Sequence, residues 1–390
     1  MRVRSVAVLA AVSAVVLAGL VVPAEAAPQH TLTISAPGGT TVDYGDTVHI
    51  GGKLTPGAVG EQVALRDHYG SVLATTKTVQ FGRFAFDYAP HRDIWVHAEW
   101  QDVRSNPIEL KDRPKVTATI SDVLLFGTAN VNGTVVPWDQ GAPVSVAVLR
   151  NGTRISLQTV KLGSSSQFHL SFTVAQPGTY SAHVIYDTPR SLRGQADTAK
   201  VATPLPSLAR GSTGPTVDLL ERRLARLHYL ITNVDQTYDS VTGDAVMAFR
   251  KVQGMARTWT VDASVWTRLA SPLYPHPRDT PSGFHVEIDQ TKQVIYTVLN
   301  GAITNVLHTS TGKPSTPTHD GSFSVHRKVA GFSIGHLYYP SYFDGNRAVH
   351  GWTEVPEYAA SHGCARIPYW AAIFMFDRMP IGTRVLVYHS

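Results

Sequence analysis

The run Ser361-His362-Gly363-Cys364-Ala365-Arg366 contains the only cysteine of this 390-residue chain, and a second His-Gly pair, His350-Gly351, precedes it. A thiol next to glycine has little bulk around it, and a nearby histidine can accept its proton, as a cysteine nucleophile that attacks a carbonyl requires. One cysteine cannot form a disulfide within the chain, so the thiol stays free. This stretch predicts a cysteine enzyme whose reaction takes place in the C-terminal region.

The residues around this run predict a β-rich catalytic domain over 281–390. Apolar residues alternate from Phe284 to Ile288, and the stretch Arg384–Tyr388 provides a closing strand. Asn300-Gly301 is a strong signal for a two-residue hairpin turn. A short helix is expected over Trp370–Asp377, where apolar residues recur at helical spacing.

The same region resembles the L,D-transpeptidase (YkuD-type) family. The resemblance is carried by the Ser-His-Gly-Cys block, by Ala348-Val349-His350-Gly351 and by Tyr338 through Phe343, and it spans 283–388. Two features depart from the family pattern. The interval from His350 to Cys364 is short, and Arg366 replaces the asparagine that some members carry.

Cys364 is the expected nucleophile and His350 the expected base. An ordinary thiol has a pKa of about 8.5 and is mostly neutral at pH 7, so an imidazole that removes its proton would supply the reactive thiolate. We therefore expect the thiol to react with thiol-directed reagents at about pH 6 to 7. The family resemblance implies that the carbonyl of Gly351 fixes the tautomer of this histidine.

Other residues near the thiol are candidates for supporting roles. The amides of Gly363 and Cys364 could stabilise an oxyanion. The resemblance implies that His362 lines the site, and it ranks second to His350 as the base. Ser361 is a candidate for binding substrate and is expected to hydrogen-bond locally.

Three further residues are candidates for binding substrate. Arg366 could grip a substrate carboxylate in a bidentate fork, with a solvated surface position as the alternative. Tyr338 or Tyr339 could add an oxyanion donor, with packing as the competing role for both.

Two other kinds of site fit the sequence poorly. Neither Cys-x-x-Cys nor His-Glu-x-x-His spacing accompanies Cys364, so we expect no metal and no cofactor. The run Ser310-Thr311-Gly312-Lys313 satisfies the Ser-x-x-Lys pattern of penicillin-binding serine enzymes, which requires the start of a helix. Because glycine and proline follow a predicted strand here, we interpret this run as a strand-ending turn.

Residues 207–271 predict a small three-helix domain. Apolar residues from Val217 to Leu227 recur at helical spacing, and Asp262 is a plausible N-cap for the third helix. The region resembles the three-helix type of peptidoglycan-binding domain through Gly211–Val217 and Trp266–Leu269. A helical bundle without a ligand is the alternative.

The region before these helices contains an internal repeat. Its matching pairs are Gly52–Pro56 with Gly133–Pro137, and Phe84–Phe86 with Phe168–Leu170. Within each copy, short alternating runs are separated by Gly, Asn and Asp turns, which is typical of an antiparallel sandwich. We predict two immunoglobulin-like β-sandwiches, over 28–112 and 113–203, that act as spacers.

The first 26 residues resemble a signal peptide. Arg2 and Arg4 precede an apolar run from Val6 to Val22, and Ala24-Glu25-Ala26 resembles a cleavage site. A retained membrane anchor is the alternative, and no later stretch is apolar enough to span a bilayer. The net charge of +5 suits an anionic cell wall but is too weak and dispersed to indicate a nucleic-acid partner.

The sequence therefore predicts a multidomain, mainly β protein that is secreted and associated with the cell wall. What the resemblance implies is an exported L,D-transpeptidase that serves cell-wall organisation and cell shape by forming 3→3 peptidoglycan cross-links. Cys364 would attack a stem tetrapeptide and release D-alanine, and an amine of a neighbouring stem would resolve the acyl-enzyme. Water as the acceptor would make the protein an L,D-carboxypeptidase. A non-catalytic cell-wall binding protein is the third alternative. The expected partners are peptidoglycan stem peptides and glycan strands, and no oligomeric state is predicted.

Overall fold

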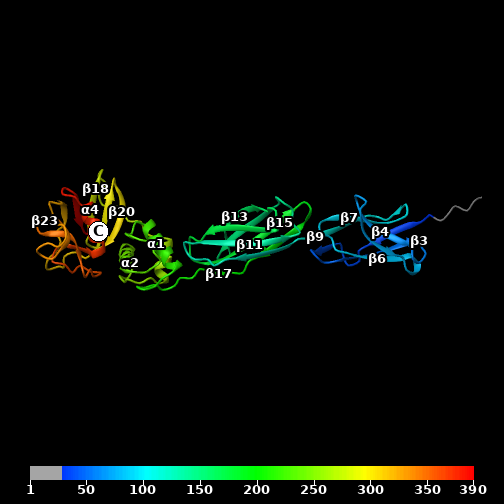
Figure 1. The fold of residues 1–390 in the computed structure, drawn as a ribbon, viewed down its shortest axis with the longest axis horizontal. Coiled ribbons are helices and arrows are strands. Elements are labelled where there is room, and N and C mark those ends of the chain that lie inside the picture. The colour runs from blue at the N-terminus through cyan, green and yellow to red at the C-terminus, as the bar shows by residue number, and fades with distance from the viewer. Residues whose placement is uncertain (1–28) are drawn as a thin grey trace, which may run out of the picture. The chain divides into compact units, whose positions relative to one another are not determined.

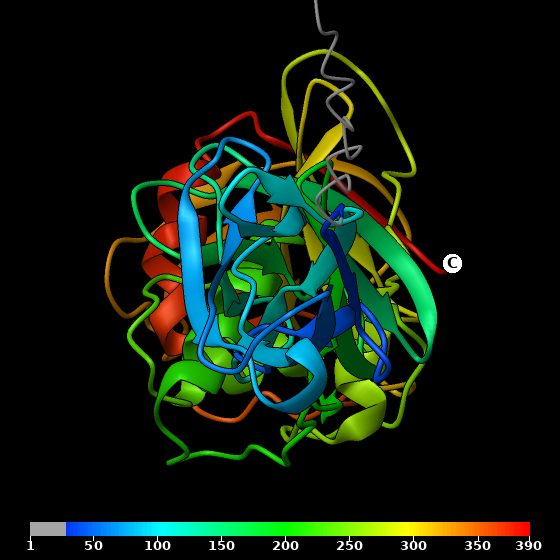
Figure 2. The same cartoon turned by 90° about the vertical axis from the view of Figure 1, so that its right-hand side faces the viewer.

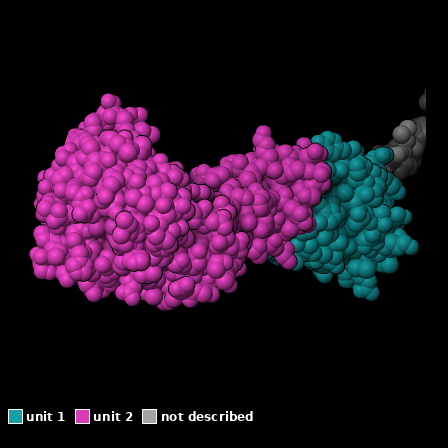
Figure 3. Space-filling model, turned by 60° about the vertical axis from the view of Figure 1, so that its left-hand side comes forward, with its two compact units in different colours: residues 1–113 teal, residues 114–390 magenta. Residues whose placement is uncertain are grey.

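A computed structural model describes residues 29–390, and the predicted signal peptide, residues 1–26, lies outside the described residues. Strands predominate, as the sequence predicts (Figure 1). The chain divides into two compact units, residues 1–113 and 114–390, which Figure 3 colours separately. No helix within 29–390 is long and apolar enough to cross a membrane.

The first unit is a pair of sheets around one apolar core (blue to cyan in Figure 2). One sheet has the order β1-β3-β6, and the other has the order β2-β9-β7-β4-β5 with β8 paired to β7. Ile50 and Leu65, one from each sheet, are completely buried between them. The strands are β1 (Thr31–Ser35), β2 (Thr41–Asp43), β3 (Val48–Thr55), β4 (Gln62–Asp67), β5 (Val72–Lys77), β6 (Arg83–Tyr88), β7 (Ile94–Trp100), β8 (Val103–Arg104) and β9 (Ile108–Arg113).

The second unit begins with another two-sheet arrangement. Its sheets have the orders β10-β11-β14 and β13-β12-β15-β16, with β17 paired to β15. Val131 and Val146 are completely buried between the two sheets. The strands are β10 (Lys115–Ile120), β11 (Thr128–Val136), β12 (Pro143–Arg150), β13 (Thr153–Lys161), β14 (Gln167–Thr173), β15 (Thr179–Thr188), β16 (Ser191–Asp197) and β17 (Val201–Ala202). We propose 28–112 and 113–203 as the limits of the two modules.

The sequence repeat corresponds to a repeated contact between a glycine and an aromatic ring. Gly52 is paired with Phe84 across β3 and β6, and Gly133 is paired with Phe168 across β11 and β14. A Cβ atom would lie 2.2 Å from Phe84 Cζ at the first glycine and 2.4 Å from Phe168 Cζ at the second. In both copies the ring therefore covers a backbone position that only glycine can occupy.

Three α-helices follow the second sandwich, at the positions that the sequence predicts. They are α1 (Pro215–Arg226), α2 (Ser240–Val252) and α3 (Ala263–Ala270). The carboxylate of Asp262 accepts hydrogen bonds from the amides of Ser264 and Val265, which confirms the predicted N-cap. α2 packs against strands β19 and β20 of the region that follows (Figure 1).

The C-terminal region contains two sheets and one helix. One sheet has the order β20-β19-β18-β26-β21, with β18 and β26 parallel, and the other has the order β22-β23-β24-β25. Asn300 and Gly301 have φ values of 48° and 77°, so they form the predicted two-residue hairpin between β19 and β20. The elements are β18 (Phe284–Asp289), β19 (Val294–Leu299), β20 (Ala302–His308), β21 (Gly321–Ser324), β22 (Arg327–Lys328), β23 (Tyr338–Asp344), β24 (Arg347–Trp352), β25 (Ala365–Pro368), α4 (Tyr369–Arg378) and β26 (Arg384–Tyr388).

β18 is buried on both faces, although its alternating sequence is typical of a strand with one polar face. Val286 and Ile288 face the apolar core, and Glu287, which points the other way, is also completely buried. The Glu287 carboxylate accepts hydrogen bonds from the backbone amides of Arg278 (2.8 Å) and Asp279 (2.9 Å). It thereby fixes the segment before the domain, 272–281, which contains four prolines.

Candidate active site

Two parallel strands bring the two predicted principal residues close together. β24 pairs with β25 in a register that sets Val349 opposite Ala365 and His350 opposite Arg366. The sulfur of Cys364, just before β25, lies 3.8 Å from the carbonyl oxygen of Asn346 and interacts with the amide of Ala348 at the start of β24. The guanidinium of Arg366 is close enough to influence the pKa of both the Cys364 thiol and the His350 imidazole. The thiol, the imidazole and this guanidinium therefore belong to one cluster.

The tautomer of His350 is fixed by its own strand. Nδ1 donates a hydrogen bond of 2.9 Å to the carbonyl oxygen of Gly351, the contact that the family resemblance implies. Nδ1 therefore carries the proton, and Nε2 has its lone pair free to accept one. The ring is buried, and this burial lowers the pKa of His350 to about 4.

Burial has the opposite effect on the acidity of the thiol. It raises the pKa of Cys364, and the Ala348 amide and the charges of Arg366 and Arg347 only partly offset it. A low imidazole pKa and a high thiol pKa together favour the neutral pair over a thiolate beside an imidazolium. Desolvation thus outweighs the nearby cations and disfavours the thiolate that the sequence leads us to expect at pH 6 to 7, an expectation that stays a prediction.

The turn before the cysteine is held by Ser361. Its hydroxyl donates a 2.5 Å hydrogen bond to the carbonyl oxygen of Cys364 and accepts one of 3.0 Å from the amide of Gly363. The Gly363 amide is thus occupied, which corrects its assignment as an oxyanion donor. The Cys364 amide has no hydrogen-bond partner in the part of the chain that the structure describes, so it is the available donor at this turn.

Gly363 has a backbone reason to be glycine. Its φ is +112°, and a Cβ atom there would lie 2.9 Å from Nε of Arg347. Its carbonyl oxygen accepts a hydrogen bond of 2.9 Å from the hydroxyl of Thr318. The residue therefore lets the turn pass close to an arginine on β24.

His362 and the Ser-x-x-Lys run lie at the edge of this turn. His362 is exposed, and its Nε2 is 3.4 Å from Nζ of Lys313. Ser310 is buried and donates a hydrogen bond of 2.6 Å to the carbonyl oxygen of Tyr358. The run 310–313 forms isolated bridges to Arg366 and Ser361 and starts no helix, which agrees with its interpretation as a turn.

The structure does not bring Tyr338 or Tyr339 to the thiol. Tyr338 pairs with Gly351 across β23 and β24, so its side chain shares the face of Gly351 and not that of His350. Its ring packs on Tyr369, 5.1 Å away between centroids, while Tyr339 packs on Phe376 at the same distance. The rings thus take the packing role against α4 that competes with substrate binding, next to a register shift in β23 between Tyr338 and Ser341.

Arg347 is a site residue that the sequence reasoning missed. It lies beside Gly363, hydrogen-bonds to Asp344 and Pro317 at 3.2 Å, and lowers the pKa of the thiol. The sequence feature that could have identified Arg347 is its place at the first position of the strand that ends in His350-Gly351-Trp352. Arg366, the residue expected to grip a substrate carboxylate, is half-buried, and its guanidinium lies 5.1 Å from the ring centre of Trp352. Two arginines thus flank the sulfur.

The segment between His350 and Cys364 is held by the preceding helical region. Arg257 donates a 2.8 Å hydrogen bond to the carbonyl oxygen of Glu357. His308 donates one of 2.8 Å from Nε2 to the carbonyl oxygen of Val355, and its Nδ1 accepts one of 2.7 Å from Nζ of Lys251 in α2. The helices are therefore a structural support of the loop 353–360, a relationship without a local sequence signal.

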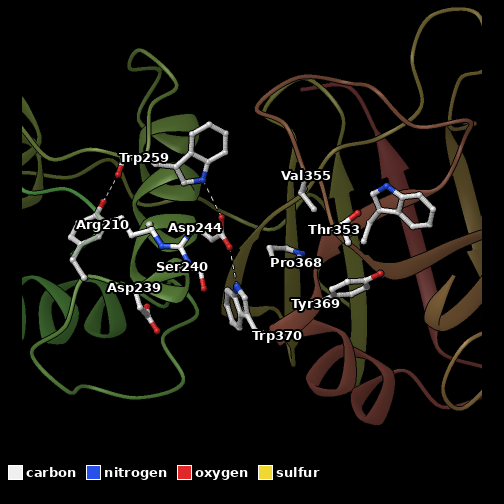
Figure 4. Close-up of a pocket in the computed structure, with 13 residues that line it drawn as sticks. Arg210, Asp239, Ser240, Asp244, Trp259, Thr353, Val355, Pro368, Tyr369 and Trp370 are labelled. Carbon is white, nitrogen blue, oxygen red and sulfur yellow. Dashed lines mark hydrogen bonds between the residues drawn. The ribbon is translucent and has the colours of Figure 1, made fainter. Parts of the chain in front are cut away.

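A cavity of about 540 Å³ lies between the helical region and the C-terminal region (Figure 4). The carboxylate of Asp244 accepts hydrogen bonds from two indole N–H groups, that of Trp259 at 3.0 Å and that of Trp370 at 2.8 Å. Trp352, beside His350, also lines this cavity. Residues 29–390 contain no group of three His, Cys, Asp or Glu side chains arranged to hold a metal ion.

Comparison with known proteins gives matches to two family models. Residues 283–387 match the L,D-transpeptidase catalytic domain, and residues 213–269 match a putative peptidoglycan binding domain. An L,D-transpeptidase structure from Xylanimonas cellulosilytica is 37% identical over 47% of this chain and 99% of that chain, with a TM-score of 0.45. An L,D-transpeptidase from Stackebrandtia nassauensis is 22% identical over 48% of this chain and 98% of that chain, with a TM-score of 0.31. No curated protein matches the chain.

Proposed function

The chain belongs to the L,D-transpeptidase family, and from this premise we propose that it uses Cys364 to form 3→3 cross-links between peptidoglycan stem peptides. The observation that carries the proposal is the cluster of one thiol, one buried imidazole with a free Nε2 and two arginines at the junction of β24 and β25. A thiol in such surroundings suits acyl transfer from an amide.

In the first half of the reaction, the stem tetrapeptide is cleaved before its terminal D-alanine. Sγ of Cys364 attacks the carbonyl carbon of the third residue as its proton passes to Nε2 of His350. The resulting oxyanion meets the Cys364 amide, and the adjacent guanidinium charges favour its formation. Collapse of the intermediate breaks the C–N bond, the imidazolium returns the proton to the leaving nitrogen, and D-alanine departs from a thioester.

In the second half, an amine from a neighbouring stem attacks the thioester. His350 removes a proton from the attacking nitrogen, the C–S bond breaks, and the sulfur recovers a proton from the imidazolium. The product is a cross-link between two third residues, and the enzyme returns to the neutral pair favoured by the pKa values of Cys364 and His350. A neutral resting pair suits this cycle because the proton moves only when the bond is made or broken.

The two arginines suit a donor that carries a carboxylate. The terminal D-alanine ends in a carboxylate, and a guanidinium binds such a group through two parallel hydrogen bonds. We assign this contact to Arg366, whose planar group stacks near Trp352, and we assign to Arg347 the positioning of the turn at Gly363. Gly351 orients the base through its carbonyl oxygen, and Ser361 orients the cysteine.

The remaining regions bring the active site to its substrate. We propose that residues 1–26 direct export, that the two sandwiches set the reach, and that the helical domain retains the enzyme on the wall. Tethering of this kind raises the local concentration of substrate without any new catalytic contact. No cofactor takes part in the steps above.

The test is incubation of the mature protein with tetrapeptide muropeptides, followed by mass analysis of the products. A linked dimer plus free D-alanine is expected. Free D-alanine without dimer would indicate an L,D-carboxypeptidase, and neither product at any pH would indicate a binding protein.

Two histidine variants provide a matched pair for this assay. His350→Ala and Cys364→Ala should each abolish both products, whereas His362→Ala, at an exposed position where the ring contacts Lys313, should keep activity within about threefold. Loss of activity in His362→Ala with retention in His350→Ala would transfer the role of base to His362.

A further inference from the structure

The cavity between the helices and the catalytic sheet reaches the neighbourhood of the active site through one residue, Trp352. Trp352 lines the cavity, and its ring also lies edge-on to that of His350 with 5.5 Å between the centroids. A ligand that packs on Trp352 in the cavity would therefore lie one side chain away from His350. When a stem peptide reaches Cys364, only a few residues of that peptide separate its reacting carbonyl from the sugar to which the peptide is attached.

The walls of the cavity present aromatic rings in fixed orientations. Trp259 from the helical region is 38% exposed and Tyr369 from α4 is 37% exposed, and both line the space. Asp244 holds the indole of Trp259 on one oxygen and that of Trp370 on the other, so one half-buried carboxylate sets a ring from each region (Figure 4). Such rings are preorganised, so little conformational entropy is lost when a ligand packs on them.

Polar groups lie at intervals between these rings. Ser240 and Arg210 are exposed on the helical side, and Thr353 is exposed on the catalytic side. Flat apolar surfaces alternating with single hydrogen-bonding groups match a pyranose ring, which has an apolar C–H face and an edge of hydroxyl and acetamide groups. The side chains of Arg210 and Asp239 at this end of the cavity carry opposite charges, so the wall does not select a strongly charged ligand.

We propose that this cavity is a binding site for the N-acetylated hexosamine strand that carries the donor stem peptide. The helical domain would then form one wall of the substrate site and not only a tether. This inference rests on the proposed function for its substrate, but the site can be tested without turnover.

The kinetic test compares two donors, free tetrapeptide and tetrapeptide attached to its disaccharide. In Trp259→Ala, KM for the disaccharide-linked donor relative to that for the free peptide should rise about tenfold over the ratio in the unmodified protein. Trp95→Ala, which removes a 47% exposed tryptophan from the first unit, is the matched control and should leave this ratio unchanged. An unchanged ratio in Trp259→Ala would overturn the proposal.

The binding test uses chitotetraose and the Cys364→Ala protein, so that no reaction is required. Calorimetry should show saturable binding that weakens about tenfold in Trp259→Ala and in Asp244→Asn, and not in Trp95→Ala. Asn keeps the shape of Asp244 but presents an amide N–H to one of the two indoles. Absence of binding, or binding that the cavity variants do not weaken, would contradict the sugar site even if cross-linking were observed. Binding without any muropeptide product would support the site and contradict the proposed reaction.

Discussion

Nζ of Lys251 in α2 lies 2.7 Å from Nδ1 of His308 at the end of β20, and both side chains are buried. The same nitrogen donates hydrogen bonds of 3.0 Å to the carbonyl oxygens of Gln293 and Thr309. His308 uses its Nε2 proton on Val355, so Nδ1 accepts and Lys251 needs three N–H groups, those of an ammonium. Burial lowers the pKa of Lys251 well below its ordinary value of 10.5, and these three acceptors oppose that effect. A buried cation held only by neutral acceptors thus joins the helical domain to the loop between His350 and Cys364.

Lys251→Met should loosen this junction. The change leaves two carbonyl groups and one imidazole nitrogen without a donor in a buried place, which we expect to cost about 3 kcal/mol in the free energy of unfolding. Calorimetry of the mature chain would measure the loss of stability. Lys292→Met is the comparison variant, because that lysine is more exposed and donates to the side chains of Asp289 and Ser390 instead of to buried neutral acceptors. Equal stability of Lys251→Met and Lys292→Met would contradict this role.

The same junction predicts sensitivity to acid. Burial and the Lys251 charge depress the pKa of His308 well below its ordinary value of 6.5. The unfolded chain therefore binds a proton there before the folded chain does, so the free energy of unfolding should decrease as the pH falls below about 6.5. His308→Asn keeps an acceptor for Lys251 but does not titrate. Its melting temperature should fall less than that of the unmodified protein between pH 7 and pH 5, and an equal fall would exclude His308 as a source of the effect.

The neutral thiol predicts slow alkylation at neutral pH. Because burial raises the pKa of Cys364 above that of an ordinary thiol, the rate of reaction with iodoacetamide should be low at pH 7 and should still increase above pH 9. Measured rates between pH 5 and pH 10, with Cys364→Ala as the blank, would give the profile. A plateau already reached at pH 6 to 7 would instead indicate a thiolate and imidazolium pair.

Ser361 should affect turnover only by positioning the turn that carries Cys364. Ser361→Ala removes the hydrogen bonds to the Cys364 carbonyl and the Gly363 amide, so the turn that presents the sulfur loses its internal support. We expect kcat to fall on the order of tenfold with little change in KM. Ser361→Thr keeps the hydroxyl and should recover most of kcat, whereas equal losses in the Ala and Thr variants would point to a purely steric effect.

Asp112 of the first unit predicts a stabilising substitution. Both carboxylate oxygens are buried without a hydrogen-bond partner in the described chain, and burial raises the pKa to about 6. Between pH 3.8 and 6 the folded chain holds a proton that the unfolded chain has lost, so stability declines as the pH rises through this window.

Asp112→Asn removes that charge and should raise the melting temperature at pH 7.5 by about 2 to 5 °C. The gain should vanish near pH 4, where the native carboxyl is protonated, so the two pH values serve as each other's control. If Asp112→Asn were less stable than the unmodified protein at pH 7.5, the Asp112 carboxylate would have a stabilising partner, and the prediction would be wrong.

Features that depend on neighbours in sequence could be predicted from the order of residues alone. The Asn300-Gly301 hairpin, the Asp262 cap and the spacing from Val217 to Leu227 each follow from backbone preferences within a few residues. The Ser361–Arg366 block and the preceding His350-Gly351 pair likewise led to a family that the comparisons support.

Other features could not be predicted in this way because they depend on register and burial. A bulge in β23 turned Tyr338 away from the site, and desolvation opposed the ion pair expected of Cys364 and His350. The cavity rings fixed by Asp244 come from segments far apart in the chain.

The sequence alone determined the chemical groups, the local elements and the family, since these depend on residue type and short-range geometry. Tertiary structure decided which face each side chain takes, which amides are free and how charges are solvated. Those properties arise only when distant segments exclude water from one another, because removal of water is what changes both hydrogen-bond partners and pKa values.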